Sequence, residues 1–201
     1  MRLRLLATAA VVLTLVVAAA PVQAAVQRDT TPVRLFADTT VVGSSTLIRH
    51  ADSIQMTLRT SELPAGHVVT VWWVIFNHPE FCQFGEAANP STGFAGTTCG
   101  AGDLGIVPGL VPDARVEPVV TRAAGHVTGA SGTASFASYM SVGAPKGQVL
   151  LGSALTNPLG ADVHLVVHDH DAIANLGNIG EEIHSFGALP GADLGFAAHE
   201  T

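Results

Sequence analysis

Nine consecutive residues, 68–76 (VVTVWWVIF), constrain the fold more than any other part of this 201-residue chain. A strand with one face in water alternates between apolar and polar residues, whereas this run is apolar on both faces. Successive side chains of a strand point to opposite sides, so Trp72 and Trp73 lie on opposite faces of the sheet. We therefore expect a central strand that is covered on both sides.

Further strands are expected between turns that are rich in glycine and proline. Residues 53–58 alternate, with Ile54, Met56 and Leu58 on one side and polar residues on the other. The remaining strand candidates are residues 34–42, 45–48, 116–121, 133–139, 148–155 and 162–171. This number of short segments is typical of an antiparallel β-sandwich. We predict an all-β, single-domain sandwich of about seven or eight strands.

One short helix is expected near the C-terminus. Asn178 can cap its first turn, and Glu181 stands three residues later, at the position of a capping box. Ile179, Ile183 and Phe186 would form its apolar stripe.

A long loop is expected at residues 77–112, which contain many glycines and show little periodicity. Cys82 and Cys99 are the only cysteines, and an even pair in an exported protein favours a disulfide. The competing interpretation, two metal ligands, lacks the usual CxxC spacing. The loop is therefore predicted to be pinned by a disulfide and to fold back over one of the two tryptophans.

The first 24 residues have the pattern of a secretory signal peptide. Arg2 and Arg4 precede an apolar run, and Pro21 and a small-residue pattern ending at Ala24 follow it. We expect cleavage after Ala24, which leaves one domain over residues 25–201 in the periplasm, cell wall or medium. An uncleaved membrane anchor is the alternative, although the run is shorter than the roughly 20 residues of a spanning helix.

The charge balance excludes two classes of partner. Of nine basic residues, two lie in the predicted signal, so seven remain against sixteen acidic ones. Such an acidic surface disfavours nucleic acid and anionic membranes. The sequence identifies no protein or small-molecule partner.

A row of histidines gives the sharpest hypothesis about chemistry. In residues 162–171 (DVHLVVHDHD), His164, His168 and His170 share one face of a strand, opposite valine and leucine. His168 and His170 are about 6.6 Å apart along a strand, within reach of one ion, whereas His164 is too far from His170 to join them. A site needs a further ligand, and the candidates are His126, His184, Asp171 and Asp162. Such a set suits zinc or copper.

Other interpretations of the histidine row stay open. Because the apolar residues face the core, water can solvate the imidazoles or local hydrogen bonds can hold them. The row can also transfer protons. No GxSxG, HExxH or SxxK hydrolase motif follows residue 24, although a serine-histidine-aspartate set can assemble from distant residues.

Three segments carry a resemblance to known proteins: 71–82 (VWWVIFNHPEFC), 124–136 (AGHVTGASGTASF) and 162–171. Together they resemble a group of uncharacterised exported bacterial proteins with WWxxFNxPExC, GHVxG and HLVVRxHG-like segments. The resemblance implies a shared fold and export but no activity. Its pattern maps onto His126, His164 and His170, and it departs at His168, where the group has arginine, and at Asp171, where it has glycine.

From these patterns we expect an exported binding or interaction module rather than a conventional enzyme. Binding of a transition metal through His168 and His170, with His126 as a third ligand, is the sharpest hypothesis about its chemistry. A metal-dependent enzyme of the dismutase or oxidase kind is the first alternative, and it would need an open coordination position. A metal-free structural or adhesive surface protein is the second.

Overall fold

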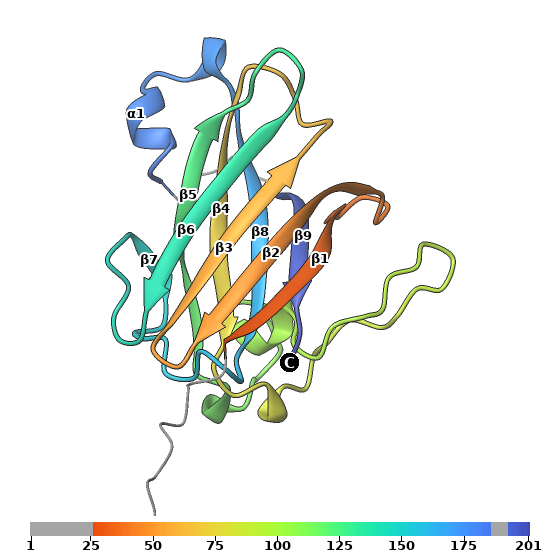
Figure 1. Cartoon of the computed structure of the whole chain (residues 1–201), viewed down its shortest axis with the longest axis vertical. Helices are drawn as coiled ribbons and strands as arrows, with labels where there is room; N and C mark the ends of the chain where they lie inside the picture. Colours follow the sequence, from red (N-terminus) through yellow and green to blue (C-terminus); the bar gives the residue numbers. More distant parts are fainter. Residues whose placement is uncertain (1–25, 186–192) are drawn as a thin grey trace, which may run out of the picture.

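The computed structural model describes residues 26–185 and 193–201, which form nine antiparallel strands and short helices (Figure 1). The strands are β1 (Gln27–Leu35), β2 (Val41–His50), β3 (Ser53–Thr60), β4 (His67–Phe76), β5 (Pro118–Val127), β6 (Ala134–Ser141), β7 (Val149–Leu151), β8 (Asp162–Ala172) and β9 (Asp193–His199). The predicted antiparallel all-β class is confirmed, with more strands than the seven or eight expected.

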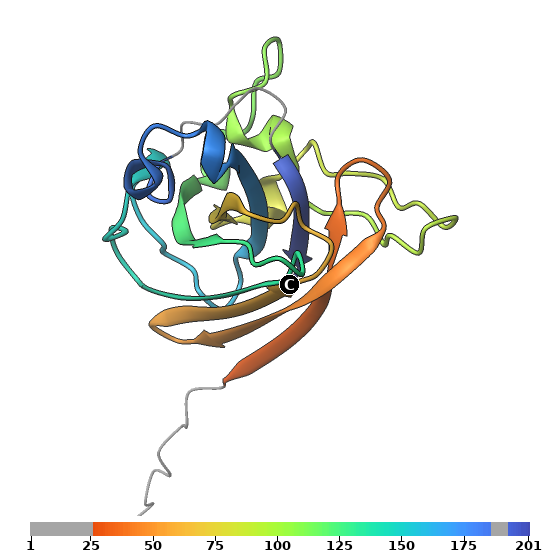
Figure 2. The same ribbon diagram turned by 90° about the horizontal axis from the view of Figure 1, so that it is seen from above.

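All nine strands belong to one sheet, in the order β6-β3-β2-β1-β9-β8-β4-β5-β7. The sheet curls until β5 lies against β6, so that its two halves face each other (Figure 2). Apolar side chains from both halves fill the space between them as the main core. Its members include Val33, Leu47, Ile54, Met56, Leu58, Trp73, Phe136, Val163, Leu165 and Val167.

Strand β4 is covered on both faces, as its sequence predicts. Trp73 points into the main core and donates a hydrogen bond to Ser138 Oγ at 3.3 Å. Trp72 points to the side of the sheet away from the main core, which we call the outer face. There it packs with Val74 and Phe76 in a second apolar cluster. Both faces of the strand are thus covered by other parts of the chain.

The segment between β4 and β5 (residues 77–117), which we call the disulfide segment, covers part of the outer face and contains the predicted disulfide. Cys82 and Cys99 are bonded, with an S–S distance of 2.03 Å. Asp103, fully buried, organises the loop by accepting hydrogen bonds from the backbone N–H groups of Gln83, Phe84 and Gly100. The turns are η1 (Pro79–Phe81), η2 (Ala101–Leu104) and η3 (Ala114–Val116). The disulfide and the fold-back over Trp72 are confirmed.

Several predicted boundaries are wrong. The expected strand over residues 34–42 is interrupted by a turn, in which Thr39 has a φ of 59°, and β1 begins already at Gln27. The glycine-rich stretch around residue 125 was expected to form a turn, but Gly125 lies within β5. It packs so closely that a Cβ atom at this position would lie 2.4 Å from the Ile183 carbonyl oxygen. Strand β9 was not predicted, since its sequence (DLGFAAH) has little β propensity.

The C-terminal helix is a single turn, α1 (Ile179–Glu182). The Asn178 side chain accepts a hydrogen bond from the backbone N–H of Glu181, as the capping pattern predicts. Phe186, predicted for the apolar stripe, lies outside the described residues, as does the predicted signal peptide over residues 1–24. Among the described residues, no helix has the length and apolar character needed to cross a membrane.

Candidate functional site

Strand β8 directs three histidines to the outer face, as predicted. His164, His168 and His170 are 8%, 6% and 1% exposed, so the expectation that water solvates them is wrong. The disulfide segment, α1 and the ends of β9 approach this face, and their carboxylates and apolar side chains replace water. The histidine row is therefore part of a second, more polar interior.

Each of these histidines is paired with a carboxylate from another part of the chain. His164 Nε2 lies 3.1 Å from Glu200, His168 Nδ1 lies 2.6 Å from Asp193, and His170 Nδ1 lies 3.2 Å from Glu182. The local hydrogen bonding that the sequence left open is thus observed. The partners come from β9, from the residue after it and from α1, so no spacing within β8 could indicate them.

His168 and His170 lie close together, with ring centroids 5.2 Å apart. His168 stacks on Trp72, whereas His170 Nε2 is 2.9 Å from the Thr70 hydroxyl. Both ring nitrogens of His170 therefore have partners, while His168 Nε2 is buried and has none among the described residues. A metal shared by this pair would have to displace Thr70 or Glu182 from His170.

His126, the third predicted ligand, is not brought to this pair. It is paired in register with Val69, a main-core residue of β4, and its ring packs edge-on against Phe136 of β6. His126 thus lies on the core side of the sheet, opposite His168 and His170. The fold therefore does not bring His126 to His168 and His170, and a metal site made of all three residues stays a prediction.

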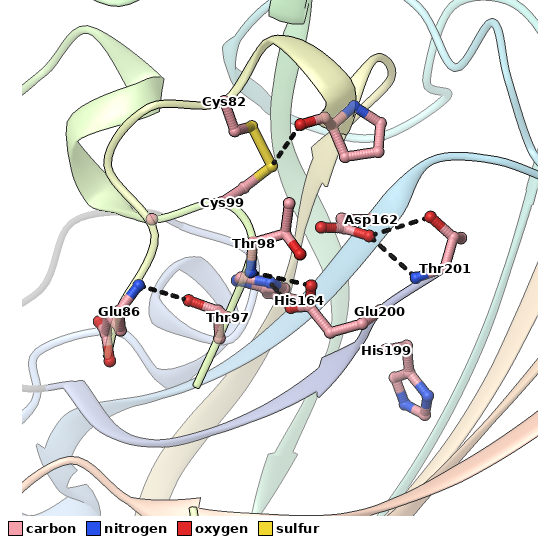
Figure 3. Close-up of polar contacts among 12 residues, drawn as sticks. Cys82, Glu86, Thr97, Thr98, Cys99, Asp162, His164, His199, Glu200 and Thr201 are labelled. Carbon is pink, nitrogen blue, oxygen red and sulfur yellow. Dashed lines mark hydrogen bonds and ion pairs between the residues drawn. A yellow bond between two sulfur atoms is a disulfide. The ribbon is translucent and has the colours of Figure 1, made fainter. Parts of the chain in front are cut away.

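A different group of ligand atoms does converge. Asp162 and His164 occupy alternate positions of β8, and Glu200 follows β9, so one potential ligand atom from each lies within 4.8 Å of the others (Figure 3). Asp162 Oδ1 accepts hydrogen bonds from the N–H and hydroxyl of Thr201. Glu200 Oε2 accepts one from the N–H of Thr98, next to the disulfide. Asp162 Oδ2 is buried and has no hydrogen-bond partner among the described residues.

The two carboxyl groups of this cluster have opposite pKa shifts. Burial raises the pKa of Asp162 to about 7, and the neighbouring Glu200 contributes to the rise. For Glu200, burial also acts to raise the pKa, but hydrogen bonds from His164 and Thr98 outweigh it and lower the pKa to about 2. Near neutral pH, Glu200 is therefore ionised, whereas ionisation of Asp162 beside it is unfavourable.

An apolar cavity of about 220 Å³ lies between the outer face and the disulfide segment. Its apolar walls include Trp72, Val74, Phe76, Leu104, Val120 and Val166. In the described part of the chain, the ionisable side chains along it are His164, Glu86 and Asp193. The sequence predicted a cover over one of the two tryptophans, but it gave no signal for a cavity beneath that cover.

A serine-histidine-aspartate chain also assembles, at one end of the main core. His199 Nδ1 lies 2.6 Å from Asp29, and its Nε2 lies 2.9 Å from Ser45 Oγ. Burial lowers the pKa of His199, against the opposing effect of Asp29. Ser45 is 1% exposed and His199 is fully buried, so no substrate carbonyl can reach the hydroxyl. The arrangement is a buried structural network in this conformation.

Comparison with known proteins identifies no relative: no family model, curated protein or solved structure matches the chain. The candidate sites therefore depend on their own geometry.

Proposed function

We propose that this protein is an extracytoplasmic binding protein for a small, mainly apolar molecule, held in the cavity beneath the disulfide segment. The cavity is the observation that carries the proposal. A preformed concave site with apolar walls and few polar groups is the usual form of a small-molecule site. At about 220 Å³, it exceeds the roughly 150 Å³ of a cavity that holds benzene, and it suits one substituted ring.

The polar groups of the cavity favour a ligand with hydrogen-bond donors. Glu86 and Asp193 are acidic, and no lysine or arginine of residues 26–185 and 193–201 lines the cavity. A carboxylate-bearing ligand would be repelled there, whereas a phenol, an indole or an amine could donate to these groups. The proposed ligand is therefore an apolar ring or branched chain that carries an N–H or O–H group.

Extracytoplasmic location is part of the proposal. The disulfide supports it, because such bonds persist in oxidising compartments. The signal-like pattern of residues 1–24 supports it from the sequence.

Ligand-observed NMR with phenol, indole and cyclohexylamine tests the cavity, with a chelator present so that metal plays no part. Val166→Phe fills the cavity, and Val142→Phe makes the same change at an exposed position away from it. We expect at least one probe to bind the wild type and Val142→Phe but not Val166→Phe. Absence of binding, or binding that survives Val166→Phe, would refute the proposal and favour the metal-free structural alternative.

A further inference from the structure

We infer that Asp162, His164 and Glu200 form a binding site for one divalent transition-metal ion, a role separate from the proposed cavity ligand. The three side chains each offer a ligand atom within 4.8 Å of the others. His164 Nε2 and Glu200 Oε1 are 3.1 Å apart, close to the separation of two neighbouring ligands around an ion with bonds of about 2.0–2.2 Å. Small side-chain movements would place three protein ligands around one ion and leave a fourth position for water.

The second observation is a buried carboxylate oxygen without a hydrogen-bond partner. Asp162 is 1% exposed, and its Oδ2 has no hydrogen-bond partner in the described part of the chain. This oxygen lies on the side of the carboxylate away from Thr201, where Figure 3 shows the Glu200 carboxylate and the His164 ring. A buried carboxylate oxygen beside a second carboxylate is unfavourable unless a proton or a cation lies between them.

The surroundings already hold the ligands in place. The Thr201 N–H binds Asp162 Oδ1, and the Thr98 N–H binds Glu200 Oε2, so each carboxylate is fixed through one oxygen. The second oxygen of Asp162 has no partner among the described residues, whereas Glu200 Oε1 is hydrogen-bonded to His164 Nε2, a contact that an ion would replace. Outer hydrogen bonds of this kind commonly orient metal-ligating carboxylates. The Glu200 side chain is 31% exposed, which gives an ion a route from solvent.

The donor set indicates the class of metal. One imidazole with two carboxylates suits zinc, manganese or ferrous iron, whereas calcium and magnesium prefer oxygen ligands alone. Zinc is the appropriate probe because its preferred distances and lack of redox chemistry make binding simple to measure.

The test is a calorimetric titration of Zn²⁺ into chelator-stripped, untagged protein, expressed from the full 201-residue chain in an export host. The site variants are Asp162→Asn and Glu200→Gln. Asp169→Asn is the matched control, because Asp169 lies on the same strand and also pairs with a histidine, His67. A His168→Gln/His170→Gln variant tests the competing histidine pair. Circular dichroism and thermal unfolding check that each variant folds.

We expect one equivalent of zinc with wild type and Asp169→Asn, and an affinity more than about a hundredfold weaker in both site variants. The His168→Gln/His170→Gln variant should bind like wild type, and Ca²⁺ should give no comparable signal. Three results would overturn the inference: no stoichiometric binding to wild type, unchanged binding by folded site variants, or loss of binding only in the His168→Gln/His170→Gln variant.

Discussion

His199 and His164 are both buried beside carboxyl groups, but they differ in how completely the polar groups around them are hydrogen-bonded. At His199, both ring nitrogens are bonded, to Asp29 and Ser45, and its carbonyl accepts from Arg49. At His164, the ring meets one carboxylate, while the neighbouring Asp162 keeps a buried oxygen without a partner among the described residues. The first cluster is complete without a ligand, whereas the second needs a proton or a cation between its two carboxyl groups.

The comparison shows that catalytic-looking geometry is a weaker sign of a site than incomplete hydrogen bonding. The Ser45-His199-Asp29 chain has the distances of a nucleophile, a base and an orienting acid, yet Ser45 and His199 are closed to solvent. Buried polar groups are normally paired, so an unpaired carboxylate oxygen calls for an explanation. Substitutions in the first cluster should therefore lower stability, whereas a substitution at Asp162 should not.

Removing Arg49 should have the largest effect. This buried guanidinium donates to the carbonyl groups of Pro158, Ala161 and His199. Arg49→Met would leave these carbonyls unpaired and should lower the free energy of unfolding by about 3–5 kcal/mol. Urea denaturation measures it, with exposed Arg28→Met as the control. A loss as small as that of the control would show that the network adds little to stability.

Loss of the disulfide should come next. Cys82→Ala/Cys99→Ala removes a cross-link between residues 17 apart and should cost about 3 kcal/mol. Because Thr98 holds Glu200, the same variant should also weaken zinc binding. Urea denaturation and zinc titration, each compared with wild type, check the two effects. Unchanged zinc affinity in the folded variant would show that the loop does not orient Glu200.

Asp162→Asn should stabilise the metal-free protein. The Asn amide carries no charge, so the substitution removes the repulsion between two carboxylates. The amide can also donate a hydrogen bond to Glu200 from the position of the unpaired Asp162 oxygen. We expect a gain of about 1–2 kcal/mol in unfolding free energy at pH 8 with a chelator present. Asp169→Asn should not stabilise, because it breaks a pairing with His67. Destabilisation by Asp162→Asn would mean that the carboxylate pair is already satisfied without an ion.

The smallest effect should be the pH dependence from His199. Burial lowers its folded-state pKa, so below about pH 6.5 the unfolded chain takes up a proton that the folded protein does not. Stability should therefore fall as the pH drops below 6.5, by at most about 1.4 kcal/mol per pH unit from this group. Urea denaturation at several pH values should show a shallower fall in His199→Asn than in wild type. Equal slopes would contradict burial as the cause.

The sequence predicted those features that depend on local pattern. Alternation within β8 placed the histidines on one face, and the apolar run in β4 required cover on both sides. Glu200 could not be found in this way, because β9 has a weak strand pattern and meets β8 only through long-range pairing. Likewise, nothing local shows that His126, which is exposed, lies on the opposite side of the sheet from His170.

Anomalous diffraction at the zinc edge, from crystals soaked in Zn²⁺, tests the central claim most directly. The account predicts one strong peak within about 2.0–2.2 Å of ligand atoms from Asp162, His164 and Glu200. A peak between His168 and His170, or no ordered peak on the outer face, would contradict it.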